Sequence, residues 1–233
     1  RITHIFSNEY TKSSLEVNLN DSPESIWSKF RKGHKSAIRK AINSGISVTE
    51  HANKIEIEAF IRVYLDMCND RGIKGHTEKE MVGICNYVIE NKCGEIILAK
   101  DHGSEVIGGA IFAHQGVSVR YLLSAADPVR KDLPVTHLIL FRAIEKSREA
   151  GFQYFDFWGY NHFADPDNQM FLINRFKKGF GGYFTFFMKK LNISLIPGGF
   201  VLFRIYNKVR QLKPSRRLYS LIKKKQVGKP ELL

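Results

Sequence analysis

The feature that most constrains the fold is a run of three strand-like segments joined by very short turns. The segments are residues 95–100, 105–114 and 117–125, and the turns contain Asp101-His102-Gly103 and Gln115-Gly116. Parallel neighbours need a crossover of a dozen or more residues, whereas turns this short join antiparallel strands. The pattern therefore predicts an antiparallel meander and excludes a doubly wound parallel sheet.

Helices and further strands are expected on both sides of the meander. Ser22 can cap a helix that begins at Pro23 and stops before Gly45. The expected fold class is α/β of the α+β type, with a central twisted sheet, mixed but mostly antiparallel, flanked by helices. We expect further strands at 13–19, 46–50, 154–159 and 183–191, and helices at 23–43, 55–71, 77–91, 134–151 and 168–178.

The first expected helix has a cationic face. Lys32, Lys35 and Arg39 lie together opposite an apolar stripe that includes Phe30 and Ala41. Arginine offers a planar fork to phosphate oxygens and lysine a point charge, so Lys35 and Arg39 are candidate ligands of a diphosphate. A solvated helix face is the alternative.

Motifs that announce a particular chemistry are missing from the chain. There is no phosphate-binding GxxxxGK[ST] or GxGxxG loop, no GxSxG elbow and no HExxH or paired Cys/His spacing. We therefore expect no metal. The three cysteines form no CxxC pair, which favours a reduced, cytoplasmic protein.

Positive charge is concentrated at the end of the chain. Residues 204–233 contain ten basic side chains and one acidic side chain, and so carry +9 of the formal +13. Such a segment favours an anionic partner, either a membrane surface through residues 200–225 or the phosphates of a tRNA. A basic helix packed on its own domain is the third possibility. The longest mainly apolar stretch, 191–203, is shorter than the roughly 20 residues of a membrane span.

Several local motifs occur in an informative order. The sharpest are Gly151-Phe-Gln-Tyr-Phe-Asp156-Phe-Trp-Gly159 and Arg175-Phe-Lys-Lys-Gly-Phe-Gly181. Earlier in the chain come Leu15-Glu-Val-Asn-Leu19, Ile26-Trp27, Arg39-Lys40-Ala41, Gly45-Ile-Ser-Val48 and Tyr121-Leu-Leu-Ser-Ala125. Over roughly residues 13–195 this arrangement resembles the second domain of Fem-type (FemAB-like) aminoacyltransferases, a branch of the GNAT superfamily of N-acetyltransferases.

The resemblance implies an acyltransferase. Fem-type enzymes transfer an amino acid from aminoacyl-tRNA to an amine of a lipid- or nucleotide-linked peptidoglycan precursor. By analogy we expect aminoacyl-tRNA or acyl-CoA as donor, no bound cofactor, and a precursor of peptidoglycan or surface polysaccharide as acceptor. A cytoplasmic location, peripheral at the inner face of the cell membrane, fits these substrates. The alternatives are an acyl-CoA-dependent N-acyltransferase for an amino sugar, and a non-catalytic module that binds anionic lipid or RNA.

The resemblance also suggests roles for residues on the last expected helix. Phe176-Lys177 matches the catalytic Phe-Lys pair, in which the lysine stabilises the oxyanion of the tetrahedral intermediate. Arg175, next to the pair, is a candidate substrate ligand. The alternative is that Lys177 belongs to a solvated basic run.

Three further residues are candidates on or directly after the expected strands. Asp156 could have a raised pKa among aromatic side chains and accept the proton of the incoming amine, or it could simply bind turn amides near Gly159. Tyr121 and Tyr160 either line the acceptor groove or serve in packing. His34, His137 and His162 are expected to be surface or capping residues.

Residues 127–135 occupy the position of the superfamily's acetyl-CoA loop. They read Asp-Pro-Val-Arg-Lys-Asp-Leu-Pro-Val and contain no glycine, so few main-chain N–H groups can approach a pyrophosphate. The usual coenzyme A site is therefore disfavoured, although Arg130 and Lys131 could still meet a phosphate.

The family normally has two such domains. We expect residues 1–12 to end a missing upstream region, 13–195 to form the acyltransferase domain, and 196–233 to form a basic helical tail.

Overall fold

The computed structural model describes residues 4–7, 13–50, 52–161, 164, 167, 169–186, 191–194, 201–202 and 205. The chain divides into two compact units, Thr11–Phe187 and a second that combines Arg1–Tyr10 with Met188–Leu233. In the second unit, β1 (His4–Ser7) pairs antiparallel with β9 (Leu191–Ser194). Most of the expected tail, 196–233, lies outside the described residues.

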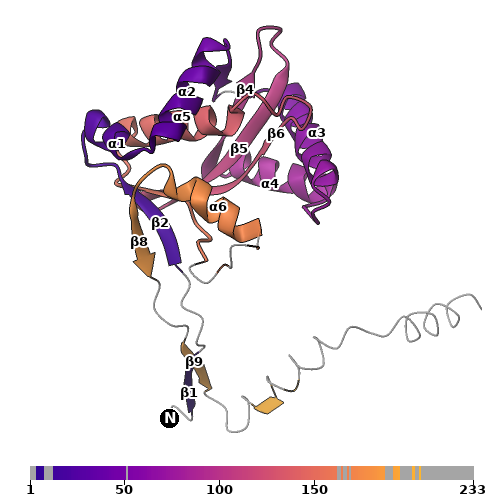
Figure 1. Cartoon of the computed structure of the whole chain (residues 1–233). Coiled ribbons are helices and arrows are strands. Elements are labelled where there is room, and N and C mark those ends of the chain that lie inside the picture. Colours follow the sequence, from indigo (N-terminus) through magenta and orange to yellow (C-terminus); the bar gives the residue numbers. More distant parts are fainter. Residues whose placement is uncertain are drawn as a thin grey trace, which may run out of the picture. The chain divides into compact units, whose positions relative to one another are not determined.

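The unit Thr11–Phe187 contains a seven-stranded sheet in the order β3-β4-β5-β6-β7-β2-β8 (Figure 1). All neighbours are antiparallel except β6 and β7. The mixed, mostly antiparallel sheet and its β4-β5-β6 meander confirm the prediction. The strands are β2 (Ser13–Asn18), β3 (Ser47–Thr49), β4 (Gly94–Lys100), β5 (Val106–Gln115), β6 (Ser118–Ala126), β7 (Tyr154–Asp156) and β8 (Tyr183–Phe186).

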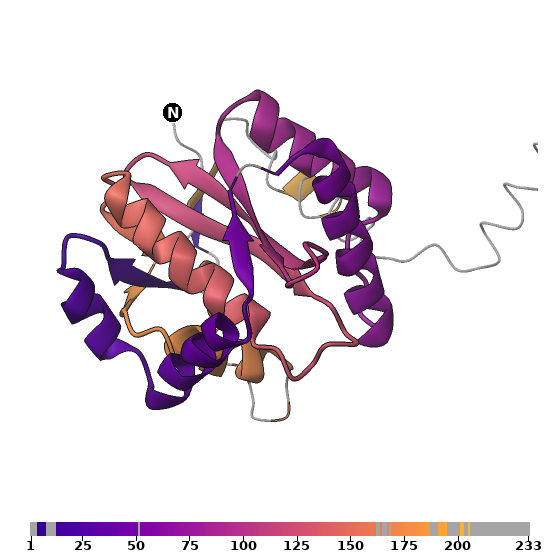
Figure 2. The same cartoon turned by 90° about the horizontal axis from the view of Figure 1, so that it is seen from above.

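Helices cover both faces of this sheet (Figure 2). Successive strand residues point to opposite faces, so Ile96 and Leu98 pack under α3 and α4 while Ile97 and Ala99 join the core formed with α2 and α5. The described helices are α1 (Pro23–Lys29), α2 (Lys32–Asn43), α3 (Lys54–Asp70), α4 (Glu78–Glu90), α5 (Val135–Glu149) and α6 (Gln169–Lys178). None of the helices that the structure describes is long and apolar enough to cross a bilayer.

The single helix expected over residues 23–43 is wrong, because the chain breaks between α1 and α2. Phe30 and Arg31 are extended, with ψ of 140° and 147°. Phe30 is 3% exposed and packs edge-on against Phe180 at 5.2 Å. The main-chain N–H of Arg31 donates to the Gly179 carbonyl at 2.8 Å. These long-range contacts replace the local hydrogen bonds that would have continued the helix.

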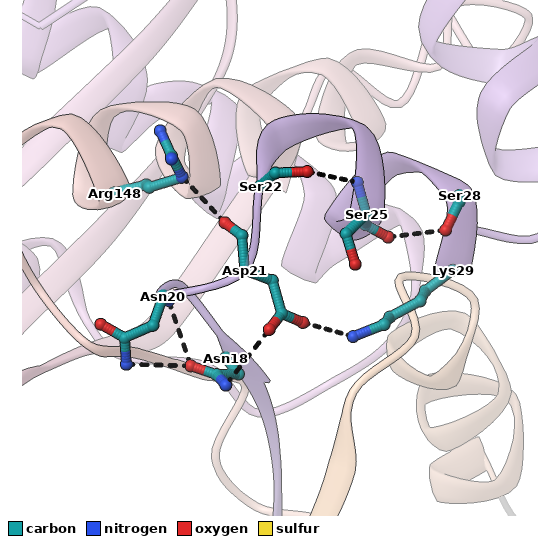
Figure 3. A network of polar contacts seen from close by, with 8 residues as sticks. All are labelled: Asn18, Asn20, Asp21, Ser22, Ser25, Ser28, Lys29 and Arg148. Carbon is teal, nitrogen blue, oxygen red and sulfur yellow. Dashed lines mark hydrogen bonds and ion pairs between the residues drawn. The ribbon is translucent and has the colours of Figure 1, made fainter.

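A polar network fixes the start of α1 (Figure 3). Ser22 caps the helix as predicted, since its hydroxyl accepts a hydrogen bond from the Ser25 N–H at 3.2 Å. The Asp21 carboxylate pairs with Lys29, and the Asp21 carbonyl accepts from Arg148 Nε at 3.0 Å. The turn after β2 is thereby attached to the last turn of α5.

Candidate active site

The two parallel strands at the centre of the sheet separate after only three residue pairs. Ser118, Val119 and Arg120 of β6 face Tyr154, Phe155 and Asp156 of β7. Strand β6 continues along β5 to Ala126, whereas the chain after β7 follows β2: the Phe157 N–H donates to the Leu15 carbonyl at 2.9 Å. In the described residues no β6–β7 pair follows, so the strands diverge at Arg120 and Asp156.

Asp156 lies at this point of divergence and is 1% exposed. One carboxylate oxygen accepts from Arg120 Nε at 2.8 Å. The other accepts from the Ser14 hydroxyl and from the Trp158 N–H, the latter at 2.7 Å. Hydrogen bonds from three donors stabilise a carboxylate in its charged form. The hydrogen bond from the Trp158 N–H is a contact with a turn amide, which is one of the two roles that the sequence suggested for Asp156.

The turn after β7 has an unusual backbone. Trp158 and Gly159 both have positive φ, of 43° and 56°. This turn ends β7 at Asp156, three residues before the predicted end of the strand. Its two carbonyl groups point to one side chain: Lys177 Nζ donates to the Trp158 oxygen and to the Gly159 oxygen, the latter at 3.3 Å.

Lys177 is buried, with 8% of its surface exposed. Burial disfavours the ammonium charge and lowers the pKa of Lys177 to about 8, although the nearby Asp156 carboxylate opposes this shift. An ammonium group has three N–H donors, and within the part of the chain that the structure describes the turn carbonyls use two of them. The lysine is thus placed as a cationic donor that titrates close to neutral pH.

Phe176, which precedes Lys177 in α6, lies in an aromatic cluster. Its ring contacts His34, His137 and Phe180, with centroid distances of 5.4, 4.9 and 5.5 Å. His34 Nε2 lies 2.9 Å from the Phe176 carbonyl oxygen and so caps the last turn of α6.

His137 is neither a surface residue nor a cap, contrary to expectation. It lies in the first turn of α5 among the rings of His34, Phe176 and Phe180. Burial, and then the neighbouring His34, lower the pKa of His137 to about 4. His162 lies outside the described residues.

The predicted phosphate ligands lie together on α2. Lys35 Nζ and the Arg39 guanidinium stand over the Trp27 ring, 6.0 and 5.8 Å from its centroid. Lys35 also donates to the Ser28 carbonyl at 2.9 Å. No described contact joins either side chain to Lys177.

The other predicted substrate ligands are dispersed. The Tyr121 hydroxyl is hydrogen-bonded to Ser124, and burial raises the pKa of Tyr121. The Tyr160 ring packs on Phe184 at 4.8 Å, and Arg175 is exposed on α6. The structure brings Lys177 close enough to Asp156 for their charges to interact, and Phe176 precedes Lys177 in α6. None of the described contacts joins Tyr121 or Arg175 to Lys177.

Sequence reasoning missed Arg120 and Ser14. Both reach Asp156 from strands that are distant in sequence, and the Arg120 guanidinium also stands 5.3 Å from the centroid of the Trp158 ring. One signal was present, because Arg120 is the single charged residue of a strand that is otherwise uncharged.

The loop before α5 holds its cations in ion pairs. Arg130 pairs with Asp101, Glu105 and Asp127, and Lys131 Nζ lies 3.1 Å from an Asp70 oxygen. A phosphate bound in this loop would compete with four carboxylates. The described residues contain no group of three or more His, Cys, Asp or Glu side chains that could hold a metal ion.

The mixed sheet has helices on both faces, and its two parallel strands diverge at Asp156, close to the buried Lys177. The model of the acetyltransferase (GNAT) domain matches residues 28–178. The chain belongs to this family.

Comparison with solved structures supports the same fold. The crystal structure of FemX aligns with a TM-score of 0.68 at 15% identity, over 77% of this chain and 61% of FemX. L-PGS from Bacillus licheniformis aligns with a TM-score of 0.54 at 9% identity, over 88% of this chain and 66% of that protein. The C-terminal domain of a putative lysylphosphatidylglycerol synthetase from Agrobacterium fabrum aligns with a TM-score of 0.57 at 10% identity, over 85% of this chain and 65% of that chain.

These alignments confirm the resemblance to Fem-type proteins at the level of the fold. The chain spans about two thirds or less of the length of these structures. Comparison with curated proteins gives no match.

Proposed function

We propose that the protein transfers an aminoacyl group from aminoacyl-tRNA to an amine of a lipid- or nucleotide-linked precursor of the cell envelope. The observation that carries this proposal is the buried Lys177, whose ammonium is held by the Trp158 and Gly159 carbonyls at the point where β6 and β7 diverge. The similarity in fold to FemX and to a putative lysylphosphatidylglycerol synthetase supports it. The latter name describes the joining of an amino acid to a lipid.

The reaction requires stabilisation of negative charge and no redox chemistry. The acceptor amine attacks the ester carbonyl, a C–N bond forms, and the carbonyl oxygen becomes an oxyanion. When the intermediate collapses, the C–O bond to the tRNA ribose breaks and the proton lost by the amine ends on the ribose oxygen. In this proposal the third N–H of Lys177 binds the oxyanion, and a donor of this kind typically contributes about 10²- to 10³-fold in rate.

In this proposal Asp156 positions the site. Its carboxylate already accepts bonds from Ser14, Arg120 and the Trp158 amide, and the last of these bonds holds the turn that orients Lys177. We therefore assign Asp156 to the support of the turn in preference to proton transfer. The Phe176 carbonyl is hydrogen-bonded to His34, and this bond fixes the last turn of α6 and with it the position of Lys177.

Acceptor binding is proposed for the cations of α2 and α6. Lys35 and Arg39 form a pair of positive charges over Trp27 that can bind the diphosphate, and Arg175 lies exposed two residues from Lys177. Tyr121 and Tyr160 would shape the groove through their rings. Residues 200–225 are proposed to bring the protein to an anionic membrane or to the tRNA.

Acyl-CoA is the second candidate donor. The GNAT family match favours it, whereas the ion-paired Arg130 and the absence of glycine in residues 127–135 disfavour a bound pyrophosphate. We therefore prefer aminoacyl-tRNA to acyl-CoA as the donor.

The test uses the full chain with two donors. Total tRNA charged with labelled amino acids, or labelled acetyl-CoA, is supplied with extracted nucleotide- and lipid-linked precursors. We expect label to move from tRNA, and Lys177→Met to reduce the rate about 10²- to 10³-fold. Lys178→Met, the same change at the exposed neighbour, should leave the rate within about twofold.

Other outcomes point elsewhere. Transfer from acetyl-CoA alone would replace the proposed donor. A Lys177→Met protein with the rate of the parent would overturn the assigned role of the lysine. Absence of transfer with either donor, combined with retained binding of tRNA or anionic vesicles, would support the non-catalytic alternative.

A further inference from the structure

Trp158 combines an unfavourable backbone with an exposed side chain. Its φ is 43°, in the left-handed region that a bulky residue rarely adopts, and 45% of its surface is exposed. Such a conformation is unfavourable for a bulky side chain and persists only where the surroundings enforce it. A chain that only needed a turn here would be more stable with asparagine or glycine.

The surroundings hold both ends of this residue. The Trp158 N–H donates to Asp156 at 2.7 Å, and its carbonyl accepts from Lys177. Arg120, itself fixed by Asp156, places its guanidinium 5.3 Å from the centroid of the indole ring. The indole is therefore a pre-positioned ring with a cation on one face and a large exposed area, and it belongs to the residue whose carbonyl accepts from Lys177, the proposed oxyanion donor.

Exposure alone would not single out this residue. Tyr87 is 63% exposed but lies within the regular helix α4, where surface aromatic residues are common and need no explanation. Trp158 differs because its backbone is strained, its ring is supported by a guanidinium, and its carbonyl binds Lys177.

We propose that Trp158 is a stacking platform for the adenine of the 3′-terminal adenosine of the tRNA donor. This inference rests on the proposed function and extends it to the recognition of the donor. A flat indole suits a nucleobase because every base presents a π-face that can stack on it. Arg120 behind the ring adds a cation–π contribution.

The covalent structure of the donor favours adenine over other bases. In aminoacyl-tRNA the reacting ester is attached to the same ribose that carries the terminal adenine, so the base lies one sugar away from the carbonyl. In acyl-CoA a ribose, a diphosphate and the pantetheine arm separate the adenine from the thioester. In a nucleotide-linked acceptor a diphosphate and a sugar separate the base from the amine. Of the three molecules, only aminoacyl-tRNA carries its base on the sugar that also bears the reacting ester. A base stacked on Trp158 would therefore bring that ester close to Lys177, which is held by the Trp158 carbonyl.

The chain has two tryptophans, which makes the test direct. Trp27→Phe leaves Trp158 as the sole indole, and Trp158→Phe leaves Trp27. The probe is an RNA minihelix ending in CCA, with an amino acid attached to its 3′ end by a stable amide. We expect it to quench the emission of the Trp27→Phe protein and to leave the emission of the Trp158→Phe protein unchanged.

Affinity gives the second measurement. Trp158→Ala should raise the Kd for the minihelix about 5- to 150-fold, which corresponds to the loss of one stacked base. Trp158→Phe should recover most of the affinity, because it keeps a ring. Tyr87→Ala, the matched removal of a remote exposed aromatic residue, should leave the Kd unchanged.

The outcomes separate this proposal from the proposed function. Quenching of Trp27 instead of Trp158, or an unchanged Kd in Trp158→Ala, would overturn the stacking platform while aminoacyl transfer continued. Quenching of Trp158 by uridine diphosphate or coenzyme A, but not by the minihelix, would also overturn it. A protein that neither binds the minihelix nor transfers from tRNA would overturn both.

Discussion

The Nζ atom of Lys177 lies 3.3 Å from the main-chain oxygen of Gly159. One buried side chain thus joins the last turn of α6 to the turn that follows β7. The two segments are 18 residues apart, and part of the chain between them lies outside the described residues. A displacement of the turn at Trp158 and Gly159 would therefore also displace the Lys177 ammonium group.

The pKa of Lys177 predicts how the proposed transfer depends on pH. Oxyanion binding needs the ammonium form, and burial lowers the pKa to about 8 from its usual 10.5. We therefore expect the part of the rate that depends on Lys177 to fall as pH rises through about 8. A kcat–pH profile from pH 6 to 10 tests this, and a Lys178→Met profile serves as control. A rate that stays constant up to pH 10 would contradict it.

Breaking the Arg120–Asp156 pair should cost a large part of the stability. Arg120→Met leaves a carboxylate with 2% side-chain exposure without its charged partner, and such changes cost about 3–5 kcal/mol in free energy of unfolding. Arg142→Met removes an exposed pair with Glu145 and should cost less than about 1 kcal/mol. Urea denaturation of both variants measures the difference. Equal losses in free energy of unfolding would show that the buried Arg120–Asp156 pair contributes no more than the exposed pair.

Acid should destabilise the protein through His137. The pKa of His137 is about 4 in the folded chain and near 6.5 when unfolded, so the unfolded state binds more protons between these values. Stability is fully present above pH 6.5 and is lost as pH falls towards 4, by about 2 kcal/mol after allowance for partial exposure. His137→Phe should flatten this loss, while His76→Phe, at an exposed site, should retain it. Parallel curves for parent and His137→Phe would argue against the assignment.

The cap of α1 gives a local prediction. Ser22→Ala removes the acceptor of the Ser25 N–H and should lower the free energy of unfolding by about 1 kcal/mol. Ser28→Ala, on the same helix, removes only a hydroxyl that donates to the Ser25 carbonyl. Thermal or urea unfolding should show a loss in the first variant and little change in the second.

Local sequence patterns predicted most of the sheet and helices. The meander of residues 95–125 followed from turns too short for any other connection, and the cap at Ser22 from its place before Pro23. The break at Phe30 could not be predicted in this way. Its cause lies about 150 residues further along the chain, in Gly179 and Phe180.

The candidate site divides along the same line. Lys177, Phe176 and Asp156 could be proposed from the sequence because local motifs contain them. Arg120 was missed because its partner is 36 residues away, and His137 because its burial comes from the rings of α2 and α6.

By itself the sequence determined the class of fold, the order of the elements and the residues on which the chemistry is proposed to depend. Hydrophobic periodicity, turn residues and caps act between near neighbours, and these are readable from the chain. The tertiary structure decided where β6 and β7 diverge, how Trp158 is presented and which carbonyls hold Lys177. Burial and the pairing of charges depend on residues that only folding brings together. Burial lowers the pKa of Lys177 to about 8, although the Asp156 carboxylate opposes this shift.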